Sequence, residues 1–180
     1  MKRIFTIAAL ALSALLLMAS AASAQVDPGT YGATFDDADA PSGTHVANNS
    51  DDPTCTVADN LDVNCDNYVL GGVGNRNATA SLVASYSAII DCNNPGNNPN
   101  NPIESHEATF EDSDDALVLP GRNGQLRVGA LEASAGSVGQ VCPNARWLPE
   151  IREGTLVLES FTYTLTFDGV DEPYITISEP

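Results

Sequence analysis

The chain has 180 residues, of which 24 are Asp or Glu and only seven are Lys or Arg, so its formal net charge at pH 7 is −17. A surface of this charge repels nucleic acids and anionic lipid headgroups, because binding to either requires positive charge. The composition therefore argues against a nucleic-acid-binding protein and against a protein that charge recruits to membranes.

Residues 1–24 have the pattern of a cleavable signal peptide. Lys2 and Arg3 precede an apolar run over residues 4–18, and residues 22–24 read A-S-A, a small-x-small cleavage signal. The alternative is a membrane anchor, but the apolar run is short for a span of roughly 20 residues. Gln25 rather than Cys follows the cleavage site, which argues against lipid attachment. We expect a secreted or periplasmic protein that has no membrane association after signal cleavage.

The mature chain, residues 25–180, is more acidic than the precursor. Cleavage of the signal peptide removes Lys2 and Arg3. The mature chain then contains five Arg, no Lys and all 24 acidic residues, which gives a net charge of 5 − 24 = −19. Its 180 − 24 = 156 residues suit one domain with its own core. Residues 25–54 are polar and predict an N-terminal arm or edge strand, and residues 55–180 predict a β-sandwich domain.

All four cysteines lie in the mature chain, at Cys55, Cys65, Cys92 and Cys142. An even number in an exported protein indicates two disulfides. Of the three possible pairings we favour Cys55–Cys65 and Cys92–Cys142, which would stabilise by about 3 and about 4 kcal/mol in the loop-entropy model. The rival interpretation is a zinc site, but no C-x-x-C pair occurs.

Most of the mature chain predicts strands. Residues 60–66, 79–92, 126–130 and 157–167 alternate apolar and polar side chains with a period of two, as half-buried strands do. The first of these places Leu61, Val63 and Cys65 on its inner face. Shorter candidate strands lie at residues 34–35, 68–70, 106–110, 116–119, 147–152 and 174–177.

Turn signals separate these strands. Residues 120–124 read P-G-R-N-G, which contains the favoured hairpin dipeptide Asn-Gly, and residues 71–75 read G-G-V-G-N. Residues 93–102 hold only Asn, Pro and Gly, and residues 131–141 are rich in small residues, so we expect loops there. Many short strands with frequent turns predict an all-β fold, an immunoglobulin-like antiparallel β-sandwich with two disulfides, with a barrel as second choice.

Acidic clusters are the candidate metal ligands. Glu111, Asp112, Asp114 and Asp115 form the densest cluster and could hold a calcium ion together with loop carbonyls. Residues 36–39 read D-D-A-D and offer a second such cluster. Residues 62–66, D-V-N-C-D, resemble the start of a calcium loop, but the Gly and the twelfth-position acid of that motif are missing, and strand alternation explains the same pattern.

No catalytic signature stands out, so we expect no catalytic residues and no cofactor other than the calcium considered above. His45 and His106 are possible bases, and Glu150 with Glu153 is a conceivable carboxylate pair, but a chain with 24 acids always offers some pair. Residues 136–139, G-S-V-G, lack the leading Gly and the strand-to-helix frame of a nucleophile elbow. Trp147 could stack on a sugar ring, although packing against a disulfide is the more common role of such an aromatic.

Several runs together resemble a loose group of uncharacterised secreted bacterial β-sandwich proteins. They are residues 65–75 (C-D-N-Y-V-L-G-G-V-G-N), residues 92–96 (C-N-N-P-G), the N-G turn at residues 123–124, and residues 142–147 (C-P-N-A-R-W). The resemblance covers about residues 55–177, with order and spacing in agreement. It implies a secreted sandwich with paired cysteines and no activity to transfer.

Two functions follow as expectations. The first is an exported non-enzymatic β-sandwich that acts at the cell surface or outside the cell by binding or assembly, with edge strands as the natural assembly surface. Its partner is unknown, and self-association or a surface glycan would fit. The alternative is a carbohydrate- or calcium-dependent binding module that uses the acidic loops and Trp147.

Overall fold

The computed structural model describes residues 25–96, 102–136 and 138–180, and the predicted signal peptide lies outside them. Within these ranges fourteen elements follow one another, and thirteen of them are strands. In the described part, no helix is long and apolar enough to cross a membrane. The chain is therefore an all-β protein, as the alternation predicts.

The strands form three antiparallel sheets. Sheet A has the order β1(Gly29–Gly32), β4(Thr54–Val57), β5(Val63–Cys65), β10(Leu131–Ala133). Sheet B has the order β11(Leu148–Ile151), β7(Ala78–Asn93), β12(Val157–Phe167), β13(Ile175–Glu179), β2(Thr34–Phe35), and β8(Glu104–Val118) also pairs with β7. Sheet C has the order β3(His45–Val46), β6(Tyr68–Gly71), β9(Leu126–Val128). A short 3-10 turn, η1(Asp37–Asp39), follows β2.

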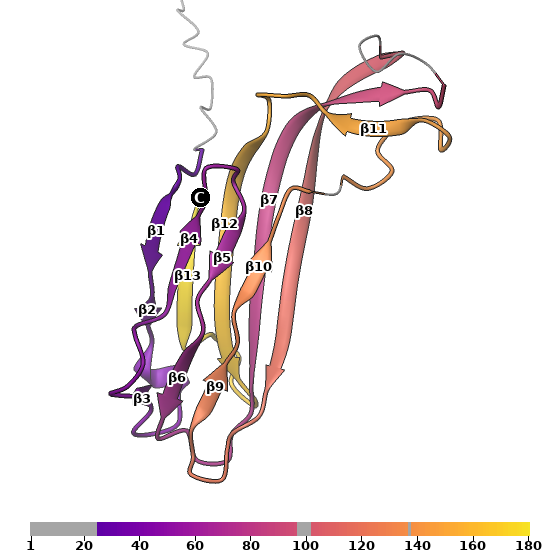
Figure 1. Ribbon diagram of the computed structural model, residues 1–180. Helices are drawn as coiled ribbons and strands as arrows, with labels where there is room; N and C mark the ends of the chain where they lie inside the picture. The colour runs from indigo at the N-terminus through magenta and orange to yellow at the C-terminus, as the bar shows by residue number, and fades with distance from the viewer. Residues whose placement is uncertain (1–24, 97–101, 137) are drawn as a thin grey trace, which may run out of the picture.

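Sheets A and C lie end to end and together form one layer against sheet B (Figure 1). The chain passes directly from sheet A to sheet C between β5 and β6, and back again between β9 and β10. One cluster of buried side chains drawn from all three sheets fills the space between the layers. This is sandwich packing with two disulfides, as predicted, while the strand order does not confirm the immunoglobulin-like connectivity.

Sheet B extends beyond the sandwich. β7 and β8 continue past the other strands, and β11 joins them there to form an arm (Figure 1). The arm has its own small core around Ala88, Ile90 and the Cys92–Cys142 disulfide. The other disulfide joins Cys55 to Cys65, which lie directly opposite each other on β4 and β5. Both pairings are those favoured from the sequence.

Residues 25–54 supply an edge strand to every sheet, namely β1 to sheet A, β2 to sheet B and β3 to sheet C. The segment is held at its start, since Val26 is buried and its N–H donates to the Leu158 carbonyl at 3.0 Å. Of the two alternatives expected for this region, edge strands describe it better than a loose arm.

Four predicted elements differ from the structure. Residues 60–62 belong to a hairpin loop rather than a strand, and Leu61 has a φ of 67° there. Burial of the Leu61 side chain and a hydrogen bond from the Tyr86 hydroxyl to its carbonyl, at 3.2 Å, hold this backbone. Residues 131–133, expected in a loop, form β10. The short strands expected at 106–110 and 116–119 are parts of one strand, β8.

Two tyrosines link the layers across the core. The Tyr68 hydroxyl on β6 and the Tyr163 hydroxyl on β12 lie 2.8 Å apart and share a hydrogen bond. Burial raises the pKa of Tyr163 to about 12 and raises that of Tyr68 still further. Both phenols therefore stay neutral, and each satisfies the other where water does not reach.

We predict that the Tyr68 and Tyr163 hydroxyls are energetically coupled. Tyr163→Phe leaves the Tyr68 hydroxyl buried without a partner, which costs about 1–3 kcal/mol of the free energy of unfolding. The variant with both tyrosines changed to Phe should lose less than the sum of the two single variants. Urea unfolding of the four proteins measures this, and additive losses would contradict the prediction.

The Gly-rich run at residues 71–75 is a packing requirement. Gly72 has a φ of +75°, and a Cβ placed on it would lie 2.0 Å from the Gly43 carbonyl oxygen. Gly74 also has a positive φ, of +63°, but a Cβ there would meet nothing within 4 Å. Alanine at Gly74 would therefore meet only backbone strain, whereas alanine at Gly72 would meet both backbone strain and a steric clash.

We therefore predict that Gly72→Ala destabilises the fold much more than Gly74→Ala. The Gly74 change carries only the cost of a left-handed alanine, about 1–2 kcal/mol, whereas the Gly72 change must also displace the chain at Gly43. Thermal or urea unfolding compares them directly. Equal losses from the two substitutions would show that the close approach is not part of the fold.

Candidate functional site

The longest strand at a sheet edge in the described part of the chain is β8, the outer strand of sheet B. It runs for 15 residues, Glu104–Val118, and is paired along that length with β7. In the described part of the chain, no strand pairs with its other edge. A row of unpaired N–H and C=O groups of this length is a template for another strand.

The hydrogen bonds around β7 show which groups of β8 are free. The Ile89 carbonyl accepts from the Arg152 N–H at 2.9 Å, and the Ile89 N–H donates to the Thr155 hydroxyl at 3.1 Å, so the backbone of Ile89 faces away from β8. Backbone direction alternates along a strand, so even-numbered residues of β7 face β8. The register pairs even with even, as in Ile90 with His106.

The odd-numbered residues of β8 therefore direct their backbone groups to the free edge. They are Ser105, Glu107, Thr109, Glu111, Ser113, Asp115 and Leu117. The same residues are exposed, whereas the residues between them are partly buried on the inner face. Each free backbone group thus lies beside a solvent-exposed side chain.

The four carboxylates predicted as metal ligands do not converge. Strand alternation places Glu111 and Asp115 on the outer face and Asp112 and Asp114 on the inner face. The described residues hold no group of three His, Cys, Asp or Glu side chains arranged to bind a metal ion. The sequence suggests a loop for the acidic run, but the run lies within β8, where strand alternation separates its side chains.

Asp112 and Asp114 have a structural role instead. Asp112 accepts a hydrogen bond from the Ser134 N–H at 2.8 Å, and Asp114 accepts one from the Glu132 N–H at 3.3 Å. Both donors belong to β10 or the residue after it, at the edge of sheet A. Carboxylates of one sheet therefore satisfy the edge of the other, and charge-assisted bonds of this kind are stronger than neutral ones.

The arm is braced on both faces. On the outer face Arg152 binds Asp91 with its Nε and Nη2 at 3.1 and 2.6 Å, and the Ser105 hydroxyl donates to the same carboxylate at 2.6 Å. These hydrogen bonds, that of Arg152 first, hold the pKa of Asp91 below its usual value. On the inner face Trp147 packs against the cluster that contains the Cys92–Cys142 disulfide. The arm is thus fixed as an extension of sheet B.

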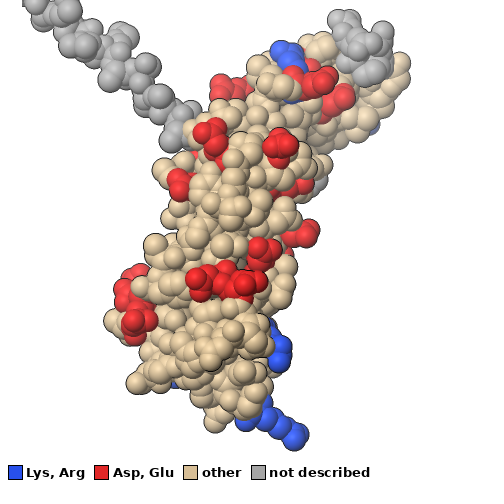
Figure 2. Space-filling view, turned by 60° about the vertical axis from the view of Figure 1, so that its left-hand side comes forward, with Lys and Arg blue, Asp and Glu red and all other residues tan. Residues whose placement is uncertain are grey.

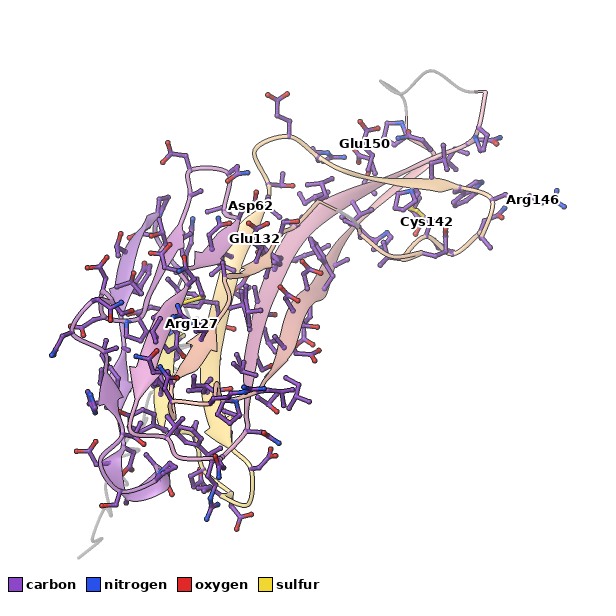
Figure 3. The ribbon with its side chains drawn as sticks, turned by 60° about the horizontal axis from the view of Figure 1, so that its bottom comes forward. Asp62, Arg127, Glu132, Cys142, Arg146 and Glu150 are labelled. Carbon is purple, nitrogen blue, oxygen red and sulfur yellow. A yellow bond between two sulfur atoms is a disulfide. The ribbon has the colours of Figure 1, made fainter. Side chains whose placement is uncertain are left out.

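The remaining candidate residues are dispersed. His45 lies on β3, where its Nδ1–H donates to the Gly43 carbonyl at 2.8 Å, and His106 lies on the inner face of β8. Glu150 accepts from the Asn93 amide at 3.0 Å, while Glu153 is exposed in the turn after β11. Figure 3 shows Cys142, Arg146 and Glu150 on the arm, away from Arg127 on the sandwich.

The other acidic motifs serve local structure. Asp36 accepts from the Ala38 N–H at 3.1 Å and caps the turn η1. Asp62 accepts from the Asn60 amide at 2.6 Å, and Asp66 accepts from the Thr54 hydroxyl at 3.0 Å. Ser137 of the G-S-V-G run lies outside the described residues.

On the face shown in Figure 2, acidic side chains are spread over the surface rather than collected in a cleft. One groove, of 490 Å³, is open and lined mainly by polar residues. They are Asn49, Ser50, Asp51, Asp52, Asp66, Asn67, Val69 and Arg127. It lacks the aromatic platform on which sugar rings stack, and Trp147 lies elsewhere, on the arm.

Comparison of the chain with protein-family models, with curated proteins and with solved structures found no match. The resemblance to secreted bacterial proteins that the short motifs suggest therefore stays a prediction. The free edge of β8 is the feature from which a function can be argued.

We predict that Asp112 and Glu111, neighbours in sequence, differ sharply in their contribution to stability. Asp112→Ala deprives the Ser134 N–H of its acceptor and should cost about 1–3 kcal/mol of the free energy of unfolding. Glu111→Ala, on the exposed face, should change it by less than about 0.5 kcal/mol. Urea unfolding of the two variants tests this, and similar losses would argue against the link between the sheets.

Proposed function

We propose that the mature chain is an exported, non-enzymatic protein that acts at the cell surface or outside the cell by binding or assembly through the free edge of β8. The observation that carries the proposal is the 15-residue length of this strand, of which one edge has no partner in the described part of the chain. Binding by addition of a strand draws its affinity from the main chain and its specificity from alternate side chains.

Among the residues that the structure describes, no other edge offers a comparable surface. The strands at the remaining sheet edges have only two to four residues each, namely β1, β2, β3, β9, β10 and β11. Short edges are one of the ways in which proteins avoid unwanted pairing. The edge of β10, moreover, is already occupied by Asp112 and Asp114. Of the strands in the described ranges, β8 alone combines length with accessible backbone groups.

Export is supported from two directions. The sequence before Gln25 has the order of a signal peptide, and Val26 is already anchored in the core. All four cysteines are in disulfides, which persist in oxidising compartments outside the cytoplasm. The dispersed positions of the candidate bases His45 and His106, on different sheets, fit a binding protein better than an enzyme.

Proline substitutions on the free edge test the proposal. Thr109→Pro with Ser113→Pro removes two outward N–H groups but no hydrogen bond to β7, and proline is tolerated on strand edges of this kind. In the native organism, from which the chromosomal copy has been deleted, we expect at least a tenfold loss of the variant from the cell-associated or matrix fraction and its release into the medium. Immunoblots of both fractions measure this.

Thr109→Val with Ser113→Ala is the matched control, because it changes the same side chains and keeps both N–H groups. It should be retained like the wild type. Thermal melts and intact masses of the purified variants establish that each is folded with both disulfides. Retention of the folded proline variant at the wild-type level would overturn the proposal.

A further inference from the structure

We infer that the partner of the β8 edge is a second copy of this chain, paired antiparallel about a two-fold axis at Glu111 and held apart at low salt by its own acids. The inference rests on the proposed role of β8 and names its occupant. A two-fold pairing uses the same edge on both copies, so it closes on itself as a dimer.

The register follows from full overlap of the two strands. With Glu111 opposite Glu111 of the other copy, Thr109 lies opposite Ser113, and Glu104 lies opposite Val118. All the odd-numbered residues, whose backbone groups are free, then form hydrogen-bonded pairs with two bonds each. No other register of the antiparallel strands uses all of these groups.

The ends of the strand match in this register. Ile103 precedes β8 and Leu119 follows it, and they are 46% and 64% exposed. In this register the two-fold axis sets Ile103 of one copy opposite Leu119 of the other, at the end of the strand where the Ile103 N–H donates to the Cys92 carbonyl of β7 at 3.0 Å. Exposed aliphatic side chains at both ends of an otherwise polar strand thus find apolar partners, which removes their surface from water. Leu117, 65% exposed, adjoins the same contact.

The middle of the strand opposes pairing. The register sets Glu107 opposite Asp115 and Glu111 opposite itself, so three pairs of like charges face each other on the outer face. Cβ atoms of opposite residues lie roughly 5 Å apart, and like charges so placed are destabilising. The overall charge of −19 on each mature chain adds to the repulsion.

The salt concentration determines whether the apolar contacts at the strand ends outweigh the repulsion between the acidic side chains in the middle. The screening length is about 10 Å at 0.1 M ionic strength, which exceeds the separation of the paired acids, and about 3 Å at 1 M, which is less than that separation. The opposed carboxylates therefore keep the chain monomeric at low salt concentration and allow the two edges to pair at high salt concentration. A basic segment of another protein would satisfy the acids but would give no reason for the aliphatic residues at both ends.

Sedimentation equilibrium of the purified mature chain at increasing NaCl concentration tests this salt dependence of dimerisation. We expect the dissociation constant of the dimer to fall at least about tenfold between 0.1 M and 1 M salt. The triple variant Glu107→Gln, Glu111→Gln, Asp115→Asn should dimerise at 0.1 M about as well as the wild type does at 1 M. A chain that is monomeric at every salt concentration would overturn the inference.

The matched control neutralises three exposed acids elsewhere, with Asp59→Asn, Glu153→Gln and Asp171→Asn. It changes the net charge by the same amount and should still require salt. If it dimerises at 0.1 M as readily as the β8 triple variant, overall charge rather than the opposed acids controls association, and the inference fails.

A cysteine at the two-fold axis tests the register. In the dimer the two Glu111 Cα atoms would lie about 5.5 Å apart, within the range that a disulfide spans. Glu111→Cys should therefore form a covalent dimer at 1 M salt in a glutathione redox buffer. Thr162→Cys is exposed on the same face of sheet B but lies on β12, away from the edge, and should not. Equal cross-linking of both would contradict the register.

Failure of this inference can be told apart from failure of the proposed function. A chain that stays monomeric at every salt concentration, while its edge proline variant is lost from the cell-associated fraction, would mean that β8 binds a different molecule. Unchanged retention of the folded proline variant would mean that the β8 edge is not the binding surface at all.

Discussion

Pairing along β7 is the constraint from which the rest of the structure follows. This 16-residue strand is hydrogen-bonded to β8 over nearly its whole length, to β12 over residues 78–87, and to β11 over residues 90–93. Its even-numbered side chains are buried, mostly without exposure to solvent. Because each successive residue must alternate in both side-chain and backbone direction, β7 fixes which groups of β8 are bonded and which are free.

The acids of β8 act differently on its two faces. On the inner face Asp112 and Asp114 hold the edge of sheet A, so a charged pair replaces a missing strand. On the outer face Glu107, Glu111 and Asp115 flank the free backbone groups and repel a second acidic strand. Inward-pointing and flanking charges are both known protections for strand edges. Here the protection depends on ionic strength, so the β8 edge can pair when the salt concentration is high.

The sequence predicts the strands that have a half-buried face. Residues 79–92 and 157–167 alternate clearly, and they form β7 and β12 with nearly the predicted limits. Cysteine count and spacing favoured the two disulfides that the structure contains. These features depend on local pattern, on burial of one face, or on the pairing of all cysteines in an exported chain, and each of these can be predicted from the sequence.

Other elements depend on partners distant in sequence. The acidic run at residues 111–115 has no apolar face, so its place in β8 comes from the ladder with β7 rather than from its own pattern. β10 has three residues and is held by β5 on one side and by two carboxylates on the other. Leu61 departs from its strand because a three-residue hairpin loop needs a left-handed residue at that position. The free edge of β8 likewise cannot be predicted from the sequence, because it is defined by how all the strands pair.

The alternation of free and bonded amides along β8 underlies both the free edge and its proposed pairing. Residue-resolved hydrogen exchange of the mature chain at low salt measures it most directly. We predict slow exchange at the even-numbered residues of β8 and rapid exchange at the odd-numbered ones, Ser105, Glu107, Thr109, Glu111, Ser113, Asp115 and Leu117. Uniform protection along the strand would mean that its outer edge is already covered, and uniformly rapid exchange would mean that β8 is not paired with β7 as described; either result would contradict the account.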